Sequence, residues 1–102
     1  MPNRIVELLT YRLQPGHDTT GFLAVVAATA PVLHGQPGLL DRSLTCDDAG
    51  IWTEVIRWTS QAHADAAGQA IMADPGAAPL MAAIDMASLT LRFQPLLWHK
   101  SG

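Results

Sequence analysis

The chain of 102 residues has a net charge of −3, and 49% of its residues are hydrophobic while 15% are charged. This length predicts one domain spanning 1–102, and the composition is too apolar for an intrinsically disordered protein. Only six lysines and arginines are present, and they are scattered, so we predict no nucleic-acid partner, because phosphate binding needs a clustered basic surface.

Cysteine usage and apolar runs indicate the compartment. The single cysteine, Cys46, cannot form an internal disulfide, which suits a reducing environment. The N-terminal residues do not read as a secretory signal, since Glu7 interrupts their short apolar stretch. The longest apolar run, 21–33, is too short to cross a membrane. We therefore expect a cytoplasmic protein with no membrane partner.

The first predicted elements are a strand and a helix. Residues 5–13 are rich in β-branched, aromatic and leucine side chains and end at the turn signal 14–16, as strands do. Asp18 is a suitable N-cap for a helix over 19–35, which Pro31 should bend or tighten near its end. The apolar face of this helix consists of residues at helical spacing, namely Phe22, Val25, Val26, Thr29, Val32 and Leu33.

Two further strands, over 39–47 and 51–59, are joined by the three-residue loop 48–50. Gly50 suits the left-handed position of such a hairpin loop. The predicted register puts Asp41 opposite Arg57 and Arg42 diagonal to Glu54. Opposite charges favour this register, because a slip by one residue would lose the direct pair.

The last elements are an alanine-rich helix and a strand. Ser60 caps a helix over 61–73, and Asp74 followed by proline restarts a short helix to about Ile84. Residues 87–95 alternate as a strand does. The order β-α-β-β-α-β predicts an α+β, ferredoxin-like fold, a four-stranded antiparallel sheet with both helices on one face.

The register assigns side chains to the two faces of this sheet. The helix-facing side should carry Leu40, Arg42, Leu44, Cys46, Trp52, Glu54, Ile56 and Trp58. The opposite, mixed face should carry Asp41, Ser43, Thr45, Thr53, Val55, Arg57, Thr90 and Arg92. The apolar tail 96–98 beyond the last strand indicates a partner surface.

Three segments resemble a known superfamily. They are Ile5-Val6-Glu7-Leu8-Leu9-Thr10-Tyr11-Arg12-Leu13-Gln14-Pro15-Gly16, Gln36-Pro37-Gly38 and Arg57-Trp58-Thr59-Ser60. They resemble antibiotic-biosynthesis-monooxygenase-type and NIPSNAP-type domains of the dimeric α/β-barrel superfamily. The resemblance implies a homodimer whose sheets pack face to face, with a small apolar cavity between each sheet and its own helices. Members include cofactor-free monooxygenases acting on polyphenols, haem-degrading enzymes, cyclases and isomerases.

The resemblance also implies that Glu7, Leu9 and Tyr11 of the first strand face this cavity. A desolvated Glu7 would have a raised pKa and could serve as a base beside Tyr11. Arg42 and Glu54 either neutralise one another or act on a ligand. Should the cavity exist, one void should be lined by Glu7, Tyr11 and Trp58.

The substrate-binding candidates combine strand and helix residues, namely Leu9, Trp58, Phe22, Arg42 and His63. Trp58 and Tyr11 could instead be core aromatics, and His63 could be exposed to solvent. The four histidines lack the spacing of a metal site, so we predict no metal. Leu9 stands where haem-degrading members have asparagine, and the only asparagine is Asn3.

Two functions fit these features. The first is a cofactor-independent monooxygenase-like or isomerase-like enzyme, with no cofactor, acting on a small apolar, aromatic molecule through Glu7 and Tyr11. The alternative is a non-catalytic homodimeric small-molecule-binding or accessory protein. The absence of an asparagine at position 9, and of any histidine between His63 and His99, favours this alternative.

Overall fold

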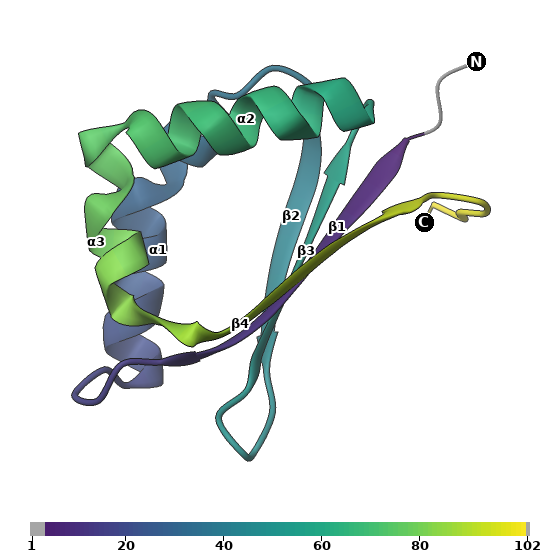
Figure 1. Cartoon of the computed structure of the whole chain (residues 1–102). Coiled ribbons are helices and arrows are strands. Elements are labelled where there is room, and N and C mark those ends of the chain that lie inside the picture. The colour runs from purple at the N-terminus through teal and green to yellow at the C-terminus, as the bar shows by residue number, and fades with distance from the viewer. Residues whose placement is uncertain (1–3, 102) are drawn as a thin grey trace.

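The computed structural model describes residues 4–101, which form an antiparallel sheet covered on one face by helices (Figure 1). In chain order the elements are β1 (Ile5–Leu13), α1 (Thr19–His34), β2 (Leu39–Cys46), β3 (Trp52–Trp58), α2 (Gln61–Ala73), the 3-10 turn η1 (Pro75–Ala77), α3 (Ala78–Ala83) and β4 (Ile84–Pro95). The strand order in the sheet is β2-β3-β1-β4. The predicted ferredoxin-like fold is thus confirmed.

Side-chain caps fix where the helices begin. The Asp18 carboxylate accepts a hydrogen bond of 2.7 Å from the backbone N–H of Gly21 at the start of α1. Ser60 Oγ accepts from the backbone N–H of His63 at the start of α2. Asp74 ends α2 and caps η1, so the chain turns and α3 can run back over the sheet. All three caps are at the predicted residues, and they satisfy backbone donors that a helix start leaves unpaired.

The β2–β3 hairpin has the predicted register. Asp41 lies opposite Arg57. Arg42 lies opposite Ile56 and is therefore diagonal to Glu54. Gly50 in the loop has a φ of +83°, the left-handed conformation that glycine adopts without steric cost. The charges of the hairpin therefore occupy opposite faces in pairs.

At the far end of this hairpin the prediction for Leu40 was wrong. The register shifts between Leu39 and Asp41, so that Leu39, and not Leu40, lies opposite Trp58. Leu40 becomes the extra residue of a bulge and is 40% exposed, while Leu39 takes the helix-facing position.

β4 begins at Ile84, three residues before the predicted start at 87. α3 ends at Ala83, and Ile84 pairs at once with Leu13 of β1. A register shift between Thr10 and Arg12 accommodates the extra length. Alternation alone did not reveal this start, because the shift interrupts the alternating pattern.

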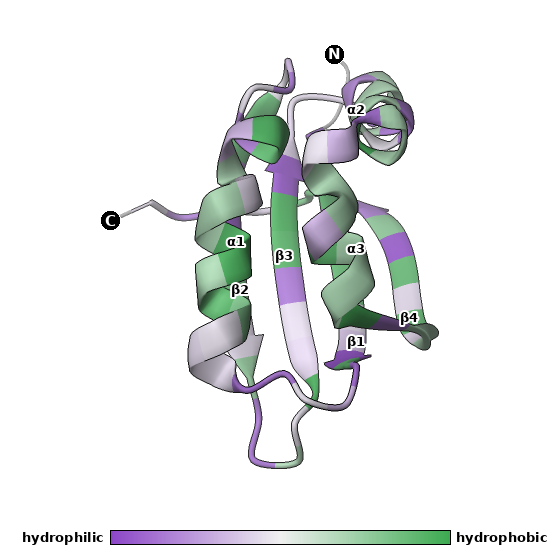
Figure 2. Cartoon of the chain, turned by 90° about the vertical axis from the view of Figure 1, so that its left-hand side faces the viewer, coloured by the Kyte–Doolittle hydropathy of each residue, from purple (hydrophilic) through white to green (hydrophobic). Residues whose placement is uncertain are grey.

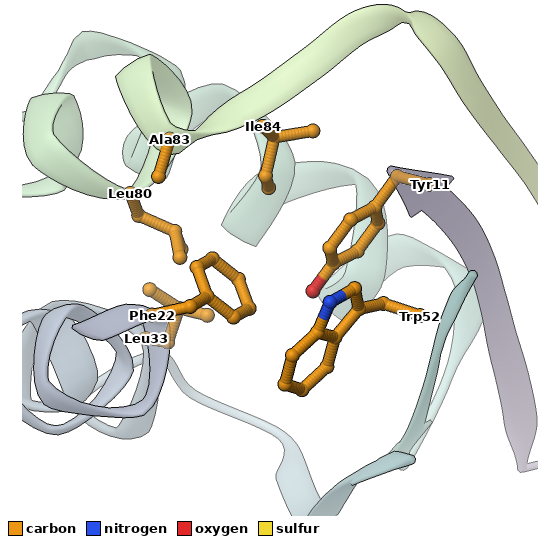
Figure 3. Packing of buried hydrophobic residues seen from close by; sticks show 7 residues of the cluster. All are labelled: Tyr11, Phe22, Leu33, Trp52, Leu80, Ala83 and Ile84. Carbon is orange, nitrogen blue, oxygen red and sulfur yellow. The ribbon is translucent and has the colours of Figure 1, made fainter. Parts of the chain in front are cut away.

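The buried core forms two groups under the helices. The larger one joins Tyr11 and Trp52 of the sheet to Phe22 of α1 and to the end of α3 (Figure 3). The ring of Phe22 packs edge-on against Trp52, with centroids 4.8 Å apart. The smaller group lies under α2 and contains Ile5, Ile56, Trp58, Ala64 and Ala67. Figure 2 looks onto the helix-covered face, where β4 runs along the edge beside α3.

Candidate functional site

A cavity of about 220 Å³ lies between the sheet and the helices. Its wall is almost wholly apolar and includes Leu9, Leu33, Leu39, Ile56, Ile71, Met72, Leu80, Ile84, Leu89 and Leu91. Its polar lining residues are Glu7, Tyr11, Arg42, Glu54 and Trp58. A concave apolar space with a few polar groups is typical of small-molecule sites.

Glu7 of β1 and Trp58 of β3 meet inside this cavity. The indole N–H of Trp58 donates a hydrogen bond of 2.9 Å to Oε1 of Glu7. Burial raises the pKa of the Glu7 carboxyl, the Trp58 hydrogen bond opposes that shift, and the charge of Glu54 adds to it. The prediction that Glu7, Trp58 and Tyr11 line one common void is confirmed.

Arg42, Glu54 and Tyr11 form a second polar cluster whose members hydrogen-bond to one another. Arg42 Nε donates to Oε2 of Glu54 at 2.7 Å, and the Tyr11 hydroxyl donates to Oε1 at 3.0 Å. The side chains of Arg42 and Glu54 are only 4% and 6% exposed, so they neutralise one another, as one of the two alternatives expected. Burial, followed by the charge and hydrogen bond of Glu54, raises the pKa of Tyr11 well above its usual range. Tyr11 is therefore a protonated donor at neutral pH.

One donor of this cluster is left over. Among the described residues, Nη2 of Arg42 is buried and has no hydrogen-bond partner. Buried polar atoms are nearly always paired, so this atom is an exception at a cavity wall.

The other sequence candidates are divided between the cavity and its surroundings. Leu9, Arg42 and Trp58 line the cavity. Phe22 is fully buried in the aromatic core and does not line it. His63 is exposed on α2, where its Nδ1 lies 2.7 Å from Ser60 Oγ, also outside the lining.

Sequence reasoning missed the helical wall of the cavity. Gly68, Ile71 and Met72 of α2 all line it. Their spacing of three and four residues places them on one side of a helix, and that pattern was available in the sequence.

Among residues 4–101, no group of three or more histidine, cysteine, aspartate or glutamate side chains is placed to hold a metal ion. No helix in the same part of the chain is long and apolar enough to cross a membrane.

Several solved structures have a fold similar to that of this chain. A candidate antibiotic biosynthesis monooxygenase from Bordetella bronchiseptica superposes with a TM-score of 0.77 at 16% identity, covering 94% of this chain and 99% of that one. A variant of SnoaB, a cofactor-independent oxygenase from Streptomyces nogalater, gives 0.71 at 17% identity, covering 95% and 96%. A candidate monooxygenase of the same description from Caulobacter crescentus gives 0.72 at 17% identity, covering 95% and 92%.

The protein has the fold of antibiotic biosynthesis monooxygenase-like proteins. At these identities the likeness shows the fold alone. The resemblance to NIPSNAP-type domains stays a prediction. No protein-family model matches the sequence, and no curated protein matches it significantly. In this monooxygenase-like fold the cavity lies between the sheet and its own helices, where the resemblance implied it.

Proposed function

We propose that the protein is a cofactor-independent monooxygenase-like or isomerase-like enzyme acting on a small apolar, aromatic molecule. The observation that carries this proposal is Glu7, a carboxyl group in an apolar cavity whose pKa is raised by burial. A carboxylate with a raised pKa is a stronger base, and proton removal is a common first step for both reactions. The fold shared with SnoaB, a cofactor-independent oxygenase, supports the choice of class.

The cavity's size points to the substrate class. A dry apolar cavity of about 150 Å³ holds one benzene molecule. The cavity here, about 220 Å³, therefore suits a molecule of roughly two fused rings. Its apolar wall favours a substrate with few polar groups.

The hydrogen bonds of Glu7 suit a base. Trp58 holds Oε1, and no hydrogen bond from the described residues occupies Oε2. Oε2 can remove a proton from a carbon next to a carbonyl or phenol group of the substrate. The resulting carbanion can regain a proton at another carbon, which is isomerisation. It can instead form a C–O bond with O₂ and take back the proton from Glu7 to give a hydroperoxide, which loses water and leaves a carbonyl group on the substrate; this is oxygenation with the substrate as the reductant. Tyr11 acts as a positioning residue for Glu54, because its hydroxyl donates a hydrogen bond to that carboxylate.

A substrate screen tests this proposal. Polyphenols and hydroxyaryl ketones are offered to the protein, with O₂ consumption and exchange of substrate hydrogen for solvent deuterium as readouts. Glu7→Gln should abolish both while aromatic ligands still quench tryptophan fluorescence. Asp41→Asn, on the opposite face of the sheet, is the matched control and should keep the full rate. An active Glu7→Gln variant would exclude Glu7 as the base.

The same cavity also favours a second candidate, a non-catalytic binding or accessory protein. Tyr11, Arg42 and Glu54 hydrogen-bond to one another, so the cavity keeps few polar groups for chemistry. Tight binding of aromatic molecules with no O₂ consumption and no deuterium exchange would support this candidate over the enzyme.

We also propose a homodimer formed through the face of the sheet that the helices leave uncovered. Leu8, Thr10 and Thr53 lie around a shallow hollow on this face. In the tail beyond β4, Leu97 and Trp98 are 88% and 79% exposed. A neighbouring pair of large apolar side chains at this exposure is typical of a partner surface. A second copy that packs on this face would cover both the hollow and the two tail side chains. We propose that this dimer is cytoplasmic.

A further inference from the structure

The inner cavity adjoins a second, more open hollow between α2 and the outer part of β4. This outer hollow has a volume of about 810 Å³ and reaches Phe93 on β4. Four residues line both spaces, namely Glu7, Gly68, Met72 and Leu91. We call these four residues the throat. Met72 is 67% exposed and Leu91 is 47% exposed, so the throat opens to solvent.

The throat lies where the helices stop covering the sheet. β4 is one of the two edge strands of the sheet, and Figures 1 and 2 show it at that edge. Leu91 lies opposite Leu9 of β1 and faces the helical side, yet it remains half exposed. Leu91 and α2 therefore border both the outer hollow and the inner cavity that Glu7 lines.

Gly68 is the residue of the throat that needs an explanation. It lies inside α2, where glycine is the poorest helix former apart from proline. Its φ is not positive, and a Cβ built on it would meet no atom within 4 Å. Gly38 differs, because it has a φ of +85° and its Cβ would approach the His63 ring to 2.5 Å. Neither backbone conformation nor packing requires glycine at position 68.

We propose that the throat is the entrance of the cavity and that the missing side chain at Gly68 sets its width. Met72 lies one helical turn beyond Gly68 on the same side of α2 and acts as the movable part of the entrance. Leu91 forms the opposite rim. This inference rests on the proposed function only in that the cavity must bind an aromatic molecule, and it does not depend on catalysis.

The kinetics of a neutral two-ring probe test the entrance. 1-Naphthol is mixed with the protein in a stopped-flow instrument, and tryptophan quenching gives the association and dissociation rates. Gly68→Leu should slow both rates about tenfold and change Kd little, because a narrower entrance affects entry and exit alike. Met72→Ala should accelerate both rates. Ala66→Leu is the matched control, since Ala66 is exposed on the same helix and lines neither space.

A second substitution guards against a misfolded leucine variant. Gly68→Ala should raise the midpoint of thermal unfolding, because alanine favours the helix. It should also slow the association and dissociation of phenol less than those of 1-naphthol. If Gly68→Leu and Gly68→Ala still bind 1-naphthol at unchanged rates, the throat is not the entrance, and the proposed function is unaffected. A change in Kd at constant association rate would also overturn it. Failure of the unaltered protein to bind 1-naphthol would contradict the throat and the proposed function together.

Discussion

Among residues 4–101, each face of the sheet carries one arginine–carboxylate pair, and both pairs come from the same hairpin. Arg42 and Glu54 lie on the helix-facing side, with side chains 4% and 6% exposed. Asp41 and Arg57 lie on the uncovered side, with the aspartate side chain 51% exposed. Alternation along a strand sends neighbouring residues to opposite faces, so two similar pairs lie in opposite environments.

Environment decides what each pair does. On the uncovered face, the hydrogen bond from Arg57 lowers the pKa of Asp41. Slight burial opposes this shift, and the positive charge of Arg57 adds to it. Water and salt screen that pair, so its contribution to stability is small. The buried pair gains little net stability because both charges lose their hydration, but neither charge can be left alone. It holds the polar end of a cavity in shape.

The largest expected effect comes from breaking the buried pair. Arg42→Met leaves Glu54 as an uncompensated buried charge and should cost about 3–5 kcal/mol of the free energy of unfolding. Urea denaturation measures this loss. Arg57→Met is the matched control on the other face and should cost much less, with a difference that salt reduces. Equal losses in the two variants would contradict the comparison.

The uncovered face should respond to changes in the tail. A chain that ends before Leu96 loses the exposed Leu97 and Trp98, each able to contribute about 1.5–3 kcal/mol when buried. We expect its dimer to dissociate about 100-fold more readily, measured by analytical ultracentrifugation. A chain that ends after Trp98 is the control and should dimerise normally. A dimer that persists at micromolar concentration without the tail would be the contrary result.

Hydrogen bonds should likewise contribute more to stability on the helix-facing side of the sheet than on the uncovered side. Tyr11→Phe leaves Oε1 of Glu54 without its donor in a buried place and should cost about 1–3 kcal/mol. Thr10→Val removes the hydroxyl that hydrogen-bonds to Thr90 on the uncovered face and should cost about 0.5 kcal/mol or less. Thermal unfolding of both variants provides the measurement, and the reverse order would refute the assignment.

The smallest effect concerns Glu7 and pH. Because its folded pKa is raised above 4.5, the folded protein binds more protons than the unfolded chain between 4.5 and that raised pKa. Stability therefore falls as pH rises through this window. Glu7→Gln lacks the carboxyl group and should be more stable than the unaltered protein at about pH 8 and similar at about pH 4. A stability difference that does not vary with pH would argue against a buried Glu7.

The sequence was sufficient for the strand side of the site. Alternation and the opposite charges of the hairpin predicted the register, which put Arg42 and Trp58 on the helix-facing side, while Glu7 of the first strand was placed there by the family resemblance. The bulge was missed because Leu39 and Leu40 are the same residue type, so no pattern distinguishes which one faces inward.

The helical side was harder to predict for a physical reason. The sequence shows which face of a helix is apolar, but not whether that face meets the core or the cavity. Phe22 is on the apolar face of α1 and belongs to the core, whereas Ile71 and Met72 of α2 reach the cavity. The way in which each helix crosses the sheet makes this difference, and crossing depends on contacts far apart in the sequence.

The titration of Glu7 tests the central claim most directly. The chain contains only two glutamates, Glu7 and Glu54, so selective ¹³C labelling of the glutamate carboxyl groups gives two NMR signals, and Glu7→Gln assigns them. We predict that Glu7 titrates above 4.5 and that the indole N–H signal of Trp58 shifts with the same midpoint. A Glu7 carboxyl that titrates at or below 4.5, with an unresponsive Trp58, would mean that it faces water and is no base inside a cavity.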